Sequence, residues 1–293
     1  MSTCERPLVW IDGEPGDQLC ALDRGFAYGD GLFETCRIQS GEVPLWRWHR
    51  ERLQASCKAL SIALNAKQLQ GWVDTALSSL AAHGIQGGTL KVVVTRGVGG
   101  RGYQYARDMA PTVVLQVHPD NLSPFTGPLK PLNVRVCDMR LAGNKVLAGH
   151  KHLNRLENVL ARAEWQDANI DEGLMLDGSG NVIEATAHNL FICQANQWYT
   201  PALDSSGVAG VMRRLLIDEL LPGIGCKVEV TAMTLADVYR ADEAILCNSN
   251  RGIRPIGEIT DPSGEAHKFL QHDNAQKLGV LFGDFLQGKG SVQ

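Results

Sequence analysis

A proline-rich stretch is the feature that most constrains how this chain can fold. Residues 119–131, PDNLSPFTGPLKP, contain four prolines and few side chains that a core could bury. Proline lacks a backbone N–H donor and restricts the residue before it, so helices and strands rarely continue through such a stretch. A chain of 293 residues also exceeds one comfortable core. We therefore predict an N-terminal domain over 1–118, a linker over 119–131 and a C-terminal domain over 132–293.

The N-terminal part has the pattern of an α+β domain. Residues 46–64 and 66–84 carry apolar side chains at helical spacing, and the second of these segments closes at Gly84. Residues 89–97 and 110–119 are apolar, β-branched runs of strand length. These segments predict two helices packed on a small sheet.

The C-terminal part alternates strands and helices without the regular period of a parallel barrel. We predict a strand over 133–139, a helix over 153–168 and a hairpin that turns on Asp177-Gly178. After the hairpin we expect the segment 189–201, a helix beginning near Gly210, a strand over 226–232, a short helix, a strand over 243–250 and then a terminal helix. This part is therefore predicted to be mixed α/β, with strands that close on themselves into a barrel-like sheet.

Charge and composition exclude several classes of protein. The net charge of −4 gives no overall basic field, so we expect no nucleic-acid or membrane partner, and no segment approaches the roughly 20 apolar residues of a membrane span. The first residues lack the pattern of a signal peptide, so a cytoplasmic protein is expected. The eight cysteines are scattered without a CxxC pair, which predicts reduced thiols and no metal site.

Lys151 lies among an unusual set of basic residues. His150 and His152 flank it, and Lys145 and Arg155 are close in sequence. Clustered cations favour the neutral form of an amine, and a neutral lysine attacks carbonyl carbons to form a Schiff base. Taken alone, however, these residues are more typical of a solvated basic loop ahead of a helix.

The sequence on both sides of Lys151 favours the Schiff-base interpretation over the solvated loop. LAGHKHLNRLENVLARAE, followed by EGLMLDGSGNVIEATAHNLF, resembles the fold-type IV family of pyridoxal-phosphate enzymes. The resemblance extends to DRGFAYGDGLFE, HRERL, GVMR and CNSNRGIRPI, and so covers most of the chain. It implies a two-domain fold with a small N-terminal domain and a larger barrel-like domain that binds pyridoxal 5'-phosphate. It also implies a homodimer, in which the loop near residues 99–107 works beside the neighbouring subunit.

The resemblance assigns roles to the main site residues. Lys151 would hold the cofactor as a Schiff base and then move protons at the substrate. Glu184 would face the pyridine nitrogen and keep it protonated, which makes the ring a better electron sink. Arg52 would bind the phosphate, because a guanidinium meets phosphate with two parallel bonds; Arg47 and Arg50 are its neighbours and competitors. The other cofactor contacts would come from a helix N-terminus and a polar turn, namely Val211, Met212, Asn248, Ser249 and Asn250.

The glycine-rich segment 97–107 needs a separate interpretation. GVGGRG superficially matches a dinucleotide fingerprint, but no helix with apolar periodicity follows it, so we reject a Rossmann site. The resemblance instead offers Arg101 and Tyr103 to a substrate carboxylate, although a flexible hairpin tip remains an alternative. Phe33 would contact the substrate, and Thr35, on the same face of its strand, would protonate the leaving group.

Within the family, the chain most closely resembles the 4-amino-4-deoxychorismate lyases. These enzymes convert 4-amino-4-deoxychorismate, a small-molecule substrate, into 4-aminobenzoate and pyruvate during folate biosynthesis. The reaction implied is a β-elimination on the bound cofactor. The alternative is a D-amino acid or branched-chain amino acid aminotransferase that uses the same Lys151 and Glu184.

Overall fold

The computed structural model of the chain describes residues 7–120, 125 and 128–287. The chain divides into two compact units, one formed by Met1–Ser123 with Lys151–Asn154, the other by Pro124–His150 with Arg155–Gln293. Each unit has its own sheet and its own buried cluster of apolar side chains.

The predicted linker, 119–131, contains the change from the first unit to the second. Its residues 121–124 and 126–127 lie outside the described part of the chain. The short segment Lys151–Asn154, which we expected in the C-terminal domain, groups with the first unit.

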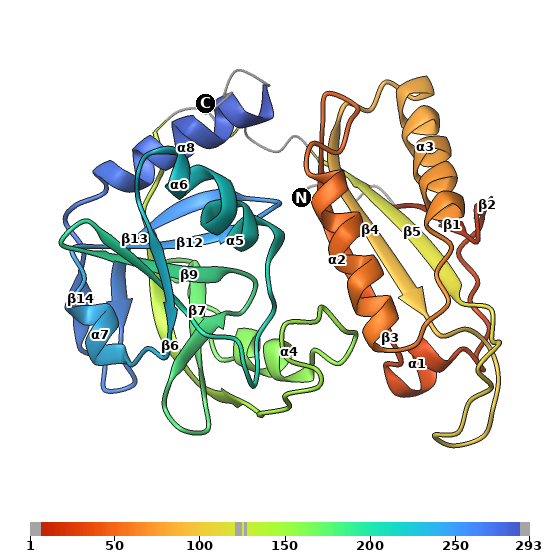
Figure 1. Cartoon of the computed structure of the whole chain (residues 1–293), viewed down its shortest axis with the longest axis horizontal. Coiled ribbons are helices and arrows are strands. Elements are labelled where there is room, and N and C mark those ends of the chain that lie inside the picture. Colours follow the sequence, from red (N-terminus) through yellow and green to blue (C-terminus); the bar gives the residue numbers. More distant parts are fainter. Residues whose placement is uncertain (1–6, 121–124, 126–127, 288–293) are drawn as a thin grey trace. The chain divides into compact units, whose positions relative to one another are not determined.

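Unit 1 is an antiparallel five-stranded sheet with helices on one face (Figure 1). The strand order is β2-β1-β5-β4-β3. Its elements are β1 (Leu8–Ile11), β2 (Glu14–Pro15), α1 (Arg24–Tyr28), β3 (Gly31–Gln39), α2 (Trp46–Ala59), α3 (Ala66–Ala82), β4 (Gly87–Thr95) and β5 (Thr112–Pro119).

The core of unit 1 is formed by side chains at strand spacing in the sheet and at helical spacing in the two long helices. Alternate residues of β4, such as Leu90 and Val92, are completely buried, as strand geometry requires. Leu53 of α2, with Leu69 and Val73 of α3, comes from helical positions and belongs to the same cluster. Burying each such side chain contributes roughly 1.5–3 kcal/mol, so the helices are fixed mainly by this packing.

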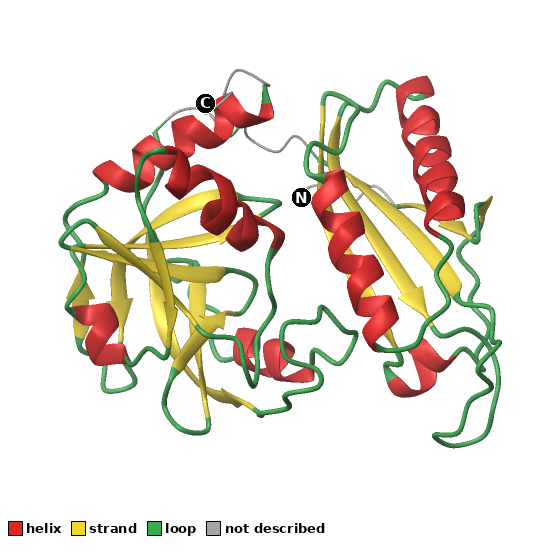
Figure 2. Ribbon diagram, viewed as in Figure 1, coloured by secondary structure: helices red, strands yellow, loops and turns green. Residues whose placement is uncertain are grey.

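Unit 2 is built on a nine-stranded mixed sheet that curls (Figure 2). The path of paired strands is β11-β10-β9-β12-β13-β6-β7-β8, and β14 pairs with β13. Strand β8 also packs against β9 and β10, so the sheet closes round an apolar core. The strands are β6 (Leu132–Leu141), β7 (Glu172–Asp177), β8 (Val182–Ala185), β9 (Asn189–Gln194), β10 (Gln197–Pro201), β11 (Val228–Thr231), β12 (Glu243–Asn248), β13 (Gly252–Thr260) and β14 (Ala266–Lys268).

The helices of unit 2 lie around this sheet. One continuous helical segment begins at Val211 and includes a π-helical turn, η1. None of the helices in the described part of the chain is long and apolar enough to cross a membrane. The helical elements are α4 (Leu156–Ala163), α5 (Val211–Leu215), η1 (Leu216–Leu220), α6 (Leu221–Gly223), α7 (Leu235–Tyr239) and α8 (Asp273–Leu286). The predicted mixed fold, with a small sheet domain and a barrel-like domain, is confirmed.

The helix predicted over 153–168 is shorter than expected. Residues ahead of it are extended because they pair with β3: the Phe33 amide donates to the Lys151 carbonyl at 2.9 Å, and the Leu153 amide donates to the Gly31 carbonyl at 2.9 Å. The helix therefore starts only at Leu156. Strand β13 is a further difference, since no strand was predicted over 252–260.

Candidate functional site

Lys151 lies on one face of the unit 1 sheet, beside β3. Its ammonium nitrogen is 4.3 Å from the centre of the Phe33 ring, and the Lys91 nitrogen is 5.7 Å from the same ring. Phe33 and Thr35 are half-buried, whereas Glu34 and Cys36 between and beyond them are buried. The strand alternation thus confirms that Phe33 and Thr35 share a face, and that face also carries Lys151.

The opposite face of β3 carries a buried ion cluster. Glu34 is 1% exposed, and its Oε1 accepts a hydrogen bond from Arg52 Nε at 2.8 Å. Its Oε2 pairs with the second guanidinium nitrogen of Arg52 and lies 2.6 Å from His49 Nδ1. Burial raises the pKa of Glu34, but the Arg52 charge and the hydrogen bonds from both partners lower it to about 2. Glu34 is therefore ionised at neutral pH.

His49 completes this cluster as a neutral side chain. It is 1% exposed, and burial lowers the pKa of its imidazole; Glu34 opposes this, while the charges of Arg52 and Lys151 lower it further. With Nδ1 donating to Glu34, His49 Nε2 is buried and has no hydrogen-bond partner among the described residues. Arg52, which is always charged, and Lys151, whenever it is protonated, thus act on a region with one carboxylate. This surplus of positive charge suits an anionic ligand such as a phosphate.

The three neighbouring arginines have different partners. Arg47 is exposed and pairs with Glu51, and Arg50 donates to Gln70 at 3.0 Å. Arg52 alone of these three turns toward β3. The sequence missed Glu34 and His49 as partners. Two features of the sequence could have shown this cluster. A glutamate at a buried strand position needs a cation as partner, and His49 lies three residues before Arg52 on the same face of the helix.

Glu184 is the buried carboxylate of unit 2. It is 4% exposed, and its Oε2 accepts hydrogen bonds from the Val208 amide at 2.9 Å and from Asn189 Nδ2 at 3.3 Å. Asn189 also donates to the Val208 carbonyl at 2.9 Å. A Cβ at Gly210 would lie 2.0 Å from the Asn189 side-chain oxygen, so only glycine fits there. Glu184 is thus held in a single orientation.

The segment that leads to Lys151 runs beside these residues. The Gly149 amide donates to the Gly207 carbonyl at 2.9 Å, and the Ala209 amide donates to the Gly149 carbonyl at 2.9 Å. Val208, whose amide holds Glu184, therefore pairs with a residue two positions before Lys151 in the chain.

The other predicted cofactor contacts also gather in unit 2. Val211 and Met212 begin α5, and Gly210, the residue before them, provides no side-chain cap for their amides. Helix α5 packs against β12, which ends at Asn248. The Asn248 side-chain oxygen accepts hydrogen bonds from the amides of Asn250 and Arg251 at 3.0 and 2.6 Å, which fixes the turn through Ser249. An uncapped helix start beside a polar turn has the donor set that a phosphate needs.

Arg101 and Tyr103 form a separate group, on the loop between β4 and β5. Both side chains are exposed, and Tyr103 is 87% exposed with its ring 5.7 Å from that of Tyr28. No helix follows GVGGRG, which agrees with our rejection of a dinucleotide site. The described residues also contain no group of three or more potential metal ligands, and their seven cysteines are free.

Comparisons with known proteins agree on one family. The sequence profile of the family described as amino-transferase class IV matches residues 31–259. An aminodeoxychorismate lyase of Vibrio harveyi is 35% identical over 88% of this chain and 93% of its own length. An aminodeoxychorismate lyase of Bacillus subtilis is 30% identical over 90% of this chain and 92% of its own length.

A solved structure is similar across nearly the whole chain. The crystal structure of the 4-amino-4-deoxychorismate lyase of Pseudomonas aeruginosa superposes with a TM-score of 0.84 at 38% identity. The match covers 94% of this chain and 98% of that one.

Proposed function

This chain belongs to the class IV aminotransferase family, and we propose that within the family it is an aminodeoxychorismate lyase. The observation that carries the proposal is the 38% identity to the Pseudomonas aeruginosa lyase across 94% of the chain. The reaction would convert 4-amino-4-deoxychorismate into 4-aminobenzoate and pyruvate, with no second substrate.

The cofactor proposed is pyridoxal 5'-phosphate, and the donor set fits it. Arg52 and Lys151 bring positive charge, α5 offers uncapped amides for a phosphate, and Glu184 is a rigid buried acceptor for a pyridinium N–H. Bound pyridoxal phosphate supplies an electron sink for the carbon that bears the substrate amine. The family resemblance assigns its phosphate contacts to Arg52 and, within unit 2, to Val211, Met212 and the turn of Asn248, Ser249 and Asn250.

The proton transfers would fall to residues of this chain. Lys151 would hold the cofactor and remove the proton from the amine-bearing ring carbon, and an equivalent proton would leave on the enolpyruvyl group, which becomes pyruvate. Thr35 shares the sheet face of Lys151, so its hydroxyl is our candidate for protonating the departing enolpyruvyl oxygen. Phe33 lies beside Lys151 on that face and would contact the substrate ring.

One experiment separates the lyase from the alternative aminotransferase, which the family description itself favours. The purified protein with pyridoxal phosphate is given aminodeoxychorismate in one cuvette, and D-alanine or a branched-chain amino acid with 2-oxoglutarate in another. We expect 4-aminobenzoate and pyruvate in the first without any amino acceptor. Amino transfer in the second, with no aromatic product in the first, would contradict the lyase and support an aminotransferase.

Glu184→Gln should slow turnover while the cofactor stays bound. A neutral amide still fills the pocket made by Val208 and Asn189, but it cannot hold the pyridine nitrogen protonated. The loss should be roughly a hundredfold in kcat, the scale of one preorganised electrostatic contact. Cofactor absorbance and initial rates would be measured together. Glu243→Gln is the matched control, because Glu243 is also buried in unit 2 but caps α8. Unchanged turnover in Glu184→Gln would remove Glu184 from this role.

Arg101→Ala should raise KM for aminodeoxychorismate. The substrate carries two carboxylates, and the loss of one charge-assisted pair corresponds to a change of roughly 10- to 100-fold. The release of 4-aminobenzoate at varied substrate concentration provides the measurement. Arg107→Ala, six positions along the same exposed loop, is the control. Equal KM values for the two variants would contradict a carboxylate contact at Arg101.

The family resemblance also leads us to propose a cytoplasmic homodimer, in which the loop near 99–107 acts beside the neighbouring subunit. Sedimentation of the active holoenzyme tests the assembly. A fully active monomer would overturn it.

A further inference from the structure

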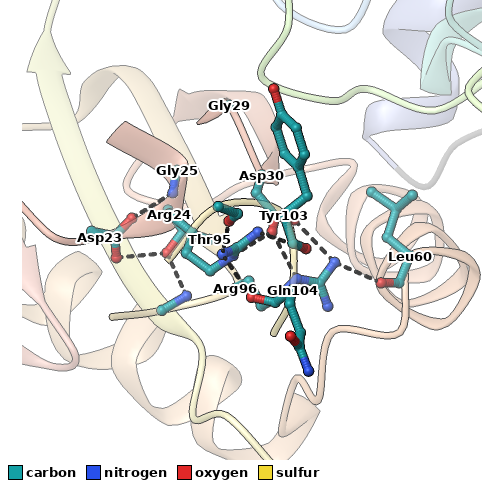
Figure 3. Close-up of polar contacts among 12 residues, drawn as sticks. Asp23, Arg24, Gly25, Gly29, Asp30, Leu60, Thr95, Arg96, Tyr103 and Gln104 are labelled. Carbon is teal, nitrogen blue, oxygen red and sulfur yellow. Dashed lines mark hydrogen bonds and ion pairs between the residues drawn. The ribbon is translucent and has the colours of Figure 1, made fainter. Parts of the chain in front are cut away.

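The base of the loop between β4 and β5 is tied to the segment that leads into α1. The Arg24 amide donates to the Gly97 carbonyl at 2.9 Å. Asp23 accepts hydrogen bonds from the Thr95 hydroxyl at 2.8 Å and from the Gly25 amide at 2.8 Å (Figure 3). The contacts from Asp23 to Thr95 and from Arg24 to Gly97 lie within unit 1, although more than 70 residues separate their partners in the chain.

The Arg24 side chain continues this connection into the loop itself. Its Nη1 donates to the carbonyls of Gly102 at 3.0 Å and Gln104 at 3.4 Å, and its Nη2 donates to the Tyr103 carbonyl at 3.4 Å (Figure 3). The guanidinium carbon lies 4.9 Å from the centre of the Tyr28 ring. Arg24 is only 3% exposed. A buried guanidinium therefore binds three successive carbonyls of an otherwise exposed loop.

Asp30 joins this arginine to the rest of unit 1. Its carboxylate accepts a hydrogen bond from Arg24 Nε at 2.9 Å. It also accepts two hydrogen bonds from the Arg96 guanidinium, one on each oxygen, at 2.8 and 3.0 Å. Arg96 also donates to the carbonyls of Leu60 and Ser61, each at 2.9 Å. Burial raises the pKa of Asp30, but hydrogen bonds and charge from Arg96 and Arg24 bring it below its usual value of 3.8. Asp30 is therefore ionised at neutral pH, and the network is fixed to the end of α2.

We propose that Arg24 is a positioning residue for substrate recognition, because it fixes the backbone between the two side chains that meet the substrate carboxylate. This inference rests on the proposed function through the roles of Arg101 and Tyr103. The bonded carbonyls at 102–104 follow Arg101 directly and include that of Tyr103 itself. The backbone is thus held from the inside while the two side chains stay exposed. A loop ordered in advance loses less entropy when a ligand binds, so Arg24 acts on KM rather than on kcat.

Two substitutions test the proposal in the pyridoxal-phosphate-loaded protein. Arg24→Gln removes the charge and the fork of donors. Arg24→Lys keeps a cation for Asp30 but cannot bond three carbonyls at once. Arg47→Gln is the matched control, because Arg47 is an exposed arginine of unit 1 that pairs with Glu51 on its own helix. Thermal unfolding and cofactor absorbance check that each variant is folded and loaded.

The first readout does not depend on activity. Trypsin cuts after arginine only where the chain opens locally, and Arg101 and Arg107 are the sites in this loop. Cleavage after these residues, identified by mass spectrometry, should be about tenfold or more faster in both Arg24 variants, since charge-assisted bonds are lost. The control should be cut at the wild-type rate.

The second readout is the split between KM and kcat. In both Arg24 variants KM for aminodeoxychorismate should rise about tenfold, while kcat stays within about threefold of wild type. Equal loop cleavage in wild type and variants would overturn the proposal, and so would a fall in kcat at unchanged KM. Failure of both Arg24 variants to fold would overturn it too, because Arg24 would then support the whole unit rather than the loop. If the Arg24 variants show faster cleavage but the wild-type protein has no lyase activity, the proposed function is wrong, whereas the role of Arg24 in holding the loop is supported.

Discussion

Replacing Lys151 with alanine is expected to abolish turnover, by roughly a thousandfold or more, as the loss of a covalent nucleophile and base usually does. The protein should remain folded. The pairing with β3 uses the Lys151 carbonyl, which alanine keeps. The contact of the half-buried Lys151 side chain with the Phe33 ring is worth about 0.5–1 kcal/mol.

The measurement is chemical trapping. Borohydride treatment followed by mass spectrometry should attach the cofactor to residue 151 in the wild type and to no residue in Lys151→Ala. Lys145→Ala is the control, because Lys145 is exposed six residues earlier in the same basic stretch. If the alanine variant still forms the reducible linkage, the nucleophile is another lysine, and Lys145 is the first to examine.

Replacing Glu34 with glutamine should destabilise unit 1 by about 3–5 kcal/mol. Glutamine has no charge, so the largely enclosed Arg52 guanidinium would lose its compensating carboxylate and neutral, buried His49 would lose its ionised hydrogen-bond partner. Urea unfolding at pH 7 measures the loss. Glu51→Gln is the control: Glu51 pairs with exposed Arg47, and its removal should change stability by less than about 1 kcal/mol.

The same carboxylate predicts how stability depends on pH. The pKa of Glu34 is about 2 in the folded protein and 4.5 in its ordinary state. A lowered folded pKa means that the unfolded chain binds the proton first on acidification. The stabilisation, on the order of 3 kcal/mol, is therefore complete above pH 4.5 and is lost as the pH falls toward 2. Glu34→Gln should lack this part of the acid transition; an unchanged acid profile would show that Glu34 contributes nothing to it.

The sequence by itself determined the family and the fold class. Both depend on local patterns: a lysine ahead of an amphipathic helix, an acidic residue after a glycine turn, and periods of two and 3.6 residues. The roles of Lys151 and Glu184 came from the same resemblance and stay predictions that the variants above test. Such patterns are readable because each is set by neighbours a few residues apart in the chain.

Only the tertiary structure decided what those residues touch. Helix α4 begins at Leu156 and not at the predicted residue 153, because the residues just before it pair with β3, more than 100 residues earlier in the chain. The sequence around Glu34 does not identify its partners, since Arg52 and His49 reach it only because α2 packs on β3. Arg24 binds carbonyls about 80 residues away. Periodicity reports which face of a segment is buried, but it carries no information about the distant partner that a buried charge or an exposed loop will find, because that partner is set by the packing of the whole unit.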